Sequence, residues 1–176
     1  FFEDLNYAAD GGLYAELIQN RSFEYSSADH PDWNFLTGWE LAEGSAACAV
    51  ALERAAPLHP NNPHYLVLRP QAAGGVGLRN GGFDGIALTA GARYQVSLFA
   101  RALAGEVGPI TVRLEGRTGE LLGQATLQAP TGEWSKLSAT LECSGDERHG
   151  RFVLLYSGGG ALALDMISLF PQATFR

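Results

Sequence analysis

Apolar and polar residues alternate along most of the chain after residue 24, and this period of two is typical of β-strands with one buried face. The clearest case is Arg93–Arg101, which carries Tyr94, Val96, Leu98 and Ala100 on one face and Gln95, Ser97, Phe99 and Arg101 on the other. Similar short segments are 33–35, 38–41, 44–52, 64–69, 110–115, 121–127, 136–143, 151–156 and 161–169. Because turns rich in Gly, Pro and Asn separate them, they predict an all-β sandwich or barrel.

The first 24 residues, FFEDLNYAADGGLYAELIQNRSFE, have a different pattern. A short apolar run carrying Glu3 leads into the turn Asp10-Gly11-Gly12, after which Leu13, Leu17 and Ile18 have helical spacing. A strand that turns into a helix is half of a βαβ unit, and nothing after Glu24 continues that alternation. The pattern therefore predicts the first strand and helix of a larger α/β domain in residues 1–19. We expect a β-sandwich in residues 20–170 and a return linker in 171–176.

Composition limits the kinds of partner. The chain has 176 residues, a formal net charge of −7 and 46% hydrophobic residues, so it is long enough for one domain with a proper core. The negative charge argues against nucleic acid or an anionic membrane surface as a partner. No apolar run is long enough for a transmembrane helix, and the first residues do not read as a signal peptide. Because the chain starts inside an apolar strand, we expect further residues before it.

The two cysteines leave two interpretations open. By strand alternation, Cys48 and Cys143 both point toward a core. They are then either two buried free thiols or, less favoured, a disulfide between facing strands. With no C-x-x-C spacing, the sequence gives no indication of zinc or redox chemistry.

No catalytic constellation is visible in the sequence. A glycosidase needs two carboxylates that flank one bond, and the acidic residues here lie mostly in loops and at strand ends with no spacing that singles out a pair. The four histidines also lie in or beside loops, where a solvated side chain is the ordinary interpretation: His30, His59, His64 and His149. The chain by itself is expected to be inert.

Three segments carry a family resemblance. Residues 1–24 resemble the N-terminal segment of family 51 α-L-arabinofuranosidases, which are glycoside hydrolases with a (β/α)8 catalytic barrel. GGFDGIALTAGARYQVSLFAR (81–101) resembles the carbohydrate-binding-module-like β-sandwich of the jelly-roll, galactose-binding type that many of these enzymes insert after the first barrel strand. ALALDMISLFPQATFR (161–176) resembles the last strand of that module and the return toward the barrel.

The resemblance implies several properties of the intact protein. Glu3 matches a glutamate that hydrogen-bonds the arabinofuranose at the C-terminal end of the first barrel strand, where barrel enzymes place active-site groups. The catalytic glutamates of the family lie on later barrel strands that this chain does not contain. The family also implies a periplasmic or extracellular location, with the catalytic barrel of the parent chain as a partner.

A sugar-binding surface requires aromatic rings for stacking and polar groups for the hydroxyls, on a face away from the core. Alternation places Tyr65, Arg69, Gln95, Phe99 and Arg101 on such faces, and they form the predicted carbohydrate-binding set. In the alternative interpretation, Phe99 packs under a loop or against the barrel. Three further aromatic residues are expected to lie in the core or to cover an edge: Trp39, Tyr94 and Trp134.

Modules of this type often hold a structural calcium ion near their first and last strands, and the resemblance places its carboxylate ligands at Glu24 and Asp165. Calcium takes six to eight oxygen ligands, so backbone carbonyls and water would have to complete the site. A hydrogen bond from a neighbouring amide to Asp165 is the alternative. No other cofactor is expected.

Together, these features predict a non-catalytic carbohydrate-binding module of an α-L-arabinofuranosidase, with arabinose-containing plant polysaccharide as its partner. The alternative is a structural insert that supports the barrel or an oligomer interface without binding sugar. An exposed aromatic platform would favour binding, whereas small and apolar residues on the same face would favour the insert.

Overall fold

The computed structural model describes residues 16–172, in which β-strands form the regular structure. Within these residues, no helix is long and apolar enough to cross a membrane. The strands are β1 (Trp39–Leu41), β2 (Cys48–Glu53), β3 (Tyr65–Pro70), β4 (Val76–Asn80), β5 (Ile86–Leu88), β6 (Arg93–Ala104), β7 (Ile110–Glu115), β8 (Leu121–Leu127), β9 (Ser135–Glu142), β10 (Glu147–Tyr156) and β11 (Ala161–Pro171).

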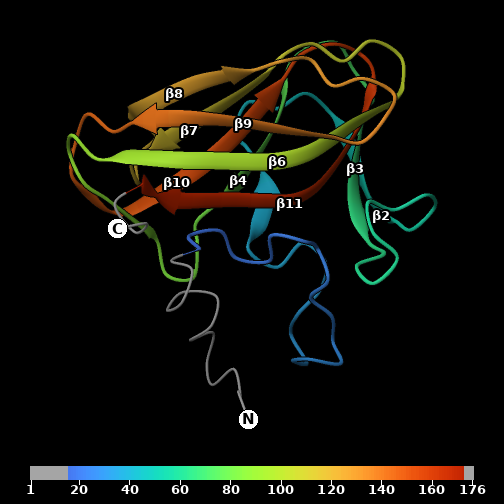
Figure 1. Ribbon diagram of the computed structural model, residues 1–176, viewed down its shortest axis with the longest axis horizontal. Helices are drawn as coiled ribbons and strands as arrows, with labels where there is room; N and C mark the ends of the chain where they lie inside the picture. Colours follow the sequence, from blue (N-terminus) through green and yellow to red (C-terminus); the bar gives the residue numbers. More distant parts are fainter. Residues whose placement is uncertain (1–15, 173–176) are drawn as a thin grey trace.

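The strands form two antiparallel sheets packed face to face (Figure 1). One sheet has the order β2-β3-β11-β6-β9. The other has the order β1-β4-β10-β7-β8, with β5 paired to the end of β10. The predicted all-β sandwich is thus confirmed for the described residues, whereas the strand and helix predicted before residue 16 lie outside them.

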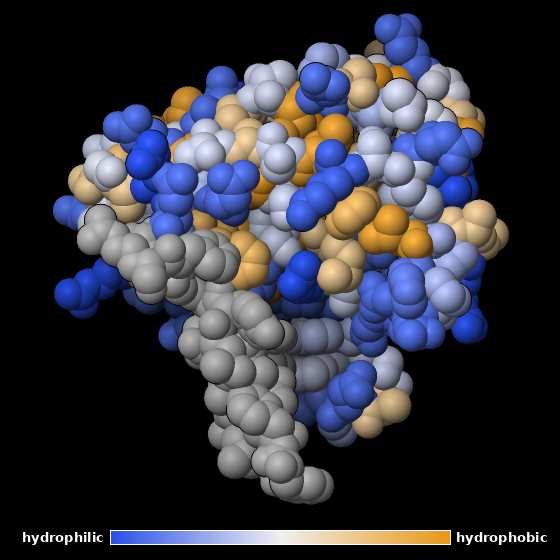
Figure 2. All heavy atoms as spheres, in the orientation of Figure 1, coloured by the Kyte–Doolittle hydropathy of each residue, from blue (hydrophilic) through white to orange (hydrophobic). Residues whose placement is uncertain are grey.

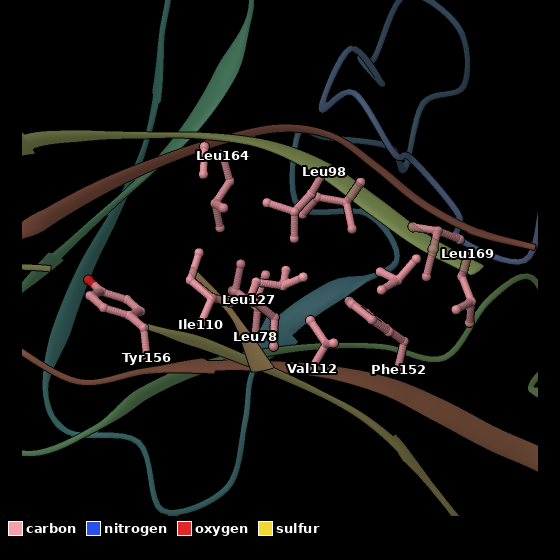
Figure 3. Close-up of a cluster of buried hydrophobic side chains, with 14 of the residues drawn as sticks. Leu78, Leu98, Ile110, Val112, Leu127, Phe152, Tyr156, Leu164 and Leu169 are labelled. Atoms are coloured by element: carbon pink, nitrogen blue, oxygen red, sulfur yellow. The ribbon is translucent and has the colours of Figure 1, made fainter. Parts of the chain in front are cut away.

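The core lies between the sheets and follows the predicted alternation. Tyr94, Val96, Leu98 and Ala100 of β6 are all at most 2% exposed, and they face side chains such as Val112 from the other sheet (Figure 3). Burying these alternate positions is what fixes the register, since a slip of one residue would turn the apolar face of a strand to solvent.

The N-terminal residues of the described chain pack into the sandwich, although the sequence predicts that they belong to the preceding segment, 1–19. Ile18 is 1% exposed and belongs to the main core. The Leu17 amide donates to the Leu169 carbonyl at 3.0 Å, and Glu16 Oε1 accepts from the Leu169 amide at 2.9 Å. Residues 16–18 are extended rather than helical. The helical spacing was misleading here because Leu17 and Ile18 pack according to their tertiary contacts.

A bulge interrupts β11 and controls which side chains face outward. The register with β6 shifts between Asp165 and Ser168, and Met166 has a positive φ of 50°. A bulge adds one residue to one strand and re-aims the neighbouring side chains. Asp165, opposite Phe99, therefore points away from the core, while Ile167 is fully buried within it.

Two smaller expectations can be compared directly. The segment 33–35, predicted as a strand, leads into a turn instead. The Asn34 side-chain oxygen accepts a hydrogen bond from the Leu36 amide, and the Asn34 amide donates one to the Thr37 hydroxyl. Such local bonds from Asn and Thr compete with a strand ladder.

Cys48 and Cys143 are free thiols, with Cys143 buried and Cys48 half-buried against the core.

Candidate functional site

The outer face of the five-stranded sheet carries the predicted carbohydrate-binding residues. Arg69 lies on β3, and Gln95, Phe99 and Arg101 alternate along β6, all on the side away from the core. In the same orientation as Figure 1, Figure 2 shows apolar atoms scattered among polar ones on this face. Gln95 is bonded to Thr140 and Arg69 to Glu53, so these polar groups already have protein partners.

Tyr65 also faces outward, as predicted, but its ring is not open to a ligand. It is 1% exposed, because the Trp134 ring packs against it edge-on with centroids 5.2 Å apart. The Tyr65 hydroxyl donates to the Ala55 carbonyl at 2.6 Å, and Trp134 Nε1 donates to the Ala56 carbonyl at 3.1 Å. The loop after β2 is therefore fastened to this face, and the expectation of an exposed Tyr65 platform is corrected.

Arg101 completes the cluster. Its guanidinium lies over both rings, 4.8 Å from the Trp134 centroid and 5.5 Å from the Tyr65 centroid, and donates to the Tyr65 hydroxyl at 3.3 Å. A guanidinium over aromatic faces is a favourable cation–π arrangement. Of the predicted set, the structure thus brings Tyr65 and Arg101 into direct contact.

Glu24 and Asp165, predicted as calcium ligands, lie close enough to influence each other. Burial raises the pKa of Asp165 to about 7, and the nearby Glu24 charge acts in the same direction. Asp165 Oδ1 accepts the Met166 amide at 2.7 Å, which is the alternative that the sequence left open. Its Oδ2 is buried and has no hydrogen-bond partner in the described structure.

The described residues offer few further ligands for a cation beside Asp165. Glu24 Oε1 accepts the His64 amide at 2.9 Å, and its other oxygen contacts His64 Nδ1. Among residues 16–172, no group of three or more His, Cys, Asp and Glu side chains is arranged to hold a metal. The orphaned Asp165 oxygen is nevertheless the kind of atom that a cation would satisfy, so the two carboxylates fit part of a calcium shell.

The outer face of the six-stranded sheet contains a groove that the sequence did not reveal. Two adjoining pockets, of about 340 and 330 Å³, share Glu43, Arg113 and Leu155. A third, of about 390 Å³, shares Arg151 with the second. We call these three neighbouring pockets together the β10 groove. Its lining runs along β10 from His149 to just beyond the strand end, a length of roughly 25 Å at about 3.4 Å per residue.

The floor of the β10 groove combines apolar and charged side chains. Val153 and Leu155 face outward between the charged residues. Glycine at position 77 lets Leu155 lie across β4, since a Cβ there would overlap the Leu155 side chain. Arg79 Nε lies 2.7 Å from Glu40, whose hydrogen bond is the main cause of the raised Arg79 pKa. Guanidinium donors and carboxylate acceptors beside an apolar floor are groups that can bind sugar hydroxyls.

Comparison by sequence finds arabinofuranosidases. The named extracellular exo-α-L-arabinofuranosidase of Streptomyces chartreusis is 41% identical over the whole chain. α-L-Arabinofuranosidase 1 of Arabidopsis thaliana is 27% identical, also over the whole chain. The chain spans only 20% and 27% of these two proteins. No family model matches the chain.

Comparison of structures gives a consistent result. An arabinose-bound family 51 α-L-arabinofuranosidase aligns with 97% of this chain at a TM-score of 0.79 and 28% identity, over 28% of its own length. The CBM22-1 xylan-binding domain of Paenibacillus barcinonensis Xyn10C aligns with 86% of this chain and 91% of its own, with a TM-score of 0.57 and 16% identity. The latter similarity shows the fold alone.

Proposed function

Given that the chain corresponds to an N-terminal segment of the family 51 α-L-arabinofuranosidases, we propose that it is the non-catalytic carbohydrate-binding module of such an enzyme. The parent enzyme would act on arabinose-containing plant polysaccharide outside the cell, as the name of the extracellular Streptomyces relative suggests. The catalytic groups would come from the rest of the parent chain, including its barrel. Glu3, the predicted arabinose contact, lies outside the described residues.

The β10 groove is the observation that carries this proposal. Sugar sites are concave and combine apolar surface with a few convergent polar groups, and the two adjoining pockets around Arg113 and Leu155 have this composition. The three arginines of the groove, Arg79, Arg113 and Arg151, project from β4, β7 and β10, which are paired neighbours in one sheet. Side chains held on a sheet lose less conformational freedom on binding than side chains on loops.

The predicted face on the other sheet is the alternative binding surface. Phe99, Gln95 and Arg69 remain partly accessible there, although Tyr65 is covered. A ligand on this face would stack on Phe99 instead of on the predicted Tyr65 ring. The two surfaces lie on opposite sides of the sandwich, so single substitutions can distinguish between them.

Affinity electrophoresis of the 176-residue chain in gels containing arabinan, arabinoxylan or xylan tests the proposal. We expect retention by at least one polysaccharide. Arg113→Ala should weaken retention about tenfold or more, since hydrogen bonds to charged groups contribute about 1.5–3 kcal/mol. Phe99→Ala is the matched variant and should leave retention unchanged. Weaker retention of Phe99→Ala with unchanged retention of Arg113→Ala would instead assign binding to the outer face of the five-stranded sheet.

A structural insert is the second candidate function, and it too has a specific observation in its favour. The outer face of the five-stranded sheet includes the apolar residues Ala51 and Phe99, which are only half-buried, whereas Val67 and Ala163 already pack with Tyr65, Leu103 and Trp134 within this chain. Such a face suits packing against the parent barrel. Absence of retention in all three gels, with a cooperatively folded chain, would favour this role over carbohydrate binding.

We also propose that Glu24 and Asp165 contribute to a structural calcium site. The partnerless buried oxygen of Asp165 supports it. The left-handed backbone at Phe23 and Met166, directly beside the two carboxylates, brings extra main-chain groups into tight turns there. A bound ion would neutralise the Asp165 carboxylate where burial otherwise disfavours its charged form.

A further inference from the structure

Charge in the β10 groove is distributed unevenly with depth. The three arginine side chains that line its middle, Arg79, Arg113 and Arg151, are 19%, 36% and 20% exposed. Of the carboxylates beside them, only Glu115 is similarly enclosed, at 16%. Glu40 and Glu43 are 62% and 84% exposed and belong to the rim. The floor therefore holds three guanidinium groups and one carboxylate.

The strand register makes these guanidinium groups converge on one point. Val153 on the central strand β10 pairs with Arg79 on one side and with Arg113 on the other. Arg151 is two residues away on β10 itself and faces the same side of the sheet. Directly paired side chains have Cβ atoms about 5 Å apart, so Val153, which is itself only 3% exposed, has an arginine side chain on three sides.

Arg151 is the least satisfied of the three. The Nε atoms of Arg79 and Arg151 are both buried without a hydrogen-bond partner in the described part of the chain, but Arg79 also has two carboxylates nearby, Glu40 at 2.7 Å and Glu43 at 3.2 Å. The carboxylate nearest to Arg151 is that of Glu115, at 3.8 Å, and this group is shared with Arg113, which is also 3.8 Å from it. One carboxylate thus serves two guanidinium groups, and an unmet buried donor costs free energy until an acceptor arrives.

We propose that the β10 groove selects glycans that carry a carboxylate, with a uronic acid residue placed above Val153 and bonded by Arg151 and Arg113. This inference rests on the proposed carbohydrate-binding function and adds the chemical class of the ligand. A carboxylate matches the planar donor geometry of a guanidinium and can accept two parallel hydrogen bonds, which a sugar hydroxyl cannot do. Glu115 lies 3.8 Å from both guanidinium groups and is their shared counter-charge, whereas Arg79 is paired with Glu40 and Glu43.

A matched pair of ligands tests this assignment. Titration calorimetry compares a uronate-bearing xylo-oligosaccharide with the same oligosaccharide after reduction of its carboxyl group, using the 176-residue chain. We expect the acidic form to bind at least tenfold more tightly. Arg151→Gln should reduce that preference to about twofold or less, because one of the two guanidinium groups proposed to bond the carboxylate is lost. Arg93→Gln, an exposed arginine of the other sheet, should retain the full preference.

The outcomes separate this inference from the proposed function. Equal binding of the two forms by the parent chain would refute carboxylate selection and leave carbohydrate binding intact. Absence of binding by both forms, together with no retention in any polysaccharide gel, would refute both. If Arg151→Gln fails to unfold cooperatively, Arg113→Gln takes its place, and an unchanged preference in that folded variant would also refute the assignment.

Discussion

Replacing Ile18 by alanine tests whether residues before the predicted boundary at residue 19 contribute to the stability of the sandwich. Ile18 is 1% exposed in the main core, so the change removes three buried carbon atoms. At about 0.8 kcal/mol for each buried methylene, the transfer loss is about 2.4 kcal/mol. A residual cavity adds roughly 1 kcal/mol, within the range known for such substitutions. We expect a loss of about 3 kcal/mol in the free energy of unfolding.

Thermal and urea unfolding of the 176-residue chain measure this loss. For a domain of this size, 3 kcal/mol corresponds to a fall in Tm of roughly 6–12 °C. Leu121→Ala is the matched control, because Leu121 is 53% exposed, and it should change stability by less than about 0.5 kcal/mol. If the two variants unfold alike, residues 16–20 are not part of the sandwich and the predicted boundary after residue 19 would stand.

The remaining predictions concern Asp165, whose pKa is raised by burial to about 7 from an ordinary value of 3.8. The folded state binds the Asp165 proton more tightly than the unfolded state does. Proton binding therefore adds roughly 4 kcal/mol to the free energy of unfolding below pH 4, and this contribution is lost as the pH rises to about 7. Urea unfolding in EDTA should therefore show that the free energy of unfolding falls more between pH 4 and pH 8 for the parent chain than for Asp165→Asn. An equal fall in the two chains would contradict this prediction. Added calcium should raise the Tm of the EDTA-treated parent chain at pH 8 but not that of Asp165→Asn, and identical melting curves with and without calcium would count against the metal site.

Alternation along the strands predicted a sandwich or barrel, the family resemblance selected the sandwich, and alternation also predicted the side on which several strand residues lie. Tyr94 and Leu98 were expected in the core and are there, and Phe99 and Arg101 were expected outside it and are there. This success has a simple cause, since a strand has a period of two and only one face of each sheet meets the core. Tyr65 shows the limit, because its side was correct although the loop after β2 and Trp134 cover it.

The β10 groove could not be predicted from the same pattern. Arg79, Arg113 and Arg151 lie on the outward sides of their strands, but that side of β10 also carries Val153 and Leu155, and the three arginines come together only through the order β4-β10-β7. That order joins segments more than 30 residues apart, and no local signal specifies which strands become neighbours. The sequence indicates which residues can face outward on a strand. The β10 groove, however, depends on the order of the strands in the sheet and on small residues such as Gly77.

The two outer faces of the sandwich differ in how they are closed, and this difference favours the groove as the binding surface. On the five-stranded sheet, Tyr65, Arg101 and Trp134 pack against one another and cover the Tyr65 ring, although the buried Arg101 Nε has no hydrogen-bond partner in the described structure. On the six-stranded sheet, the floor of the groove is formed by β10, which is paired with β4 on one side and β7 on the other. A ligand bound there would meet side chains whose backbone is already fixed, so less of its binding free energy would be spent on ordering the protein.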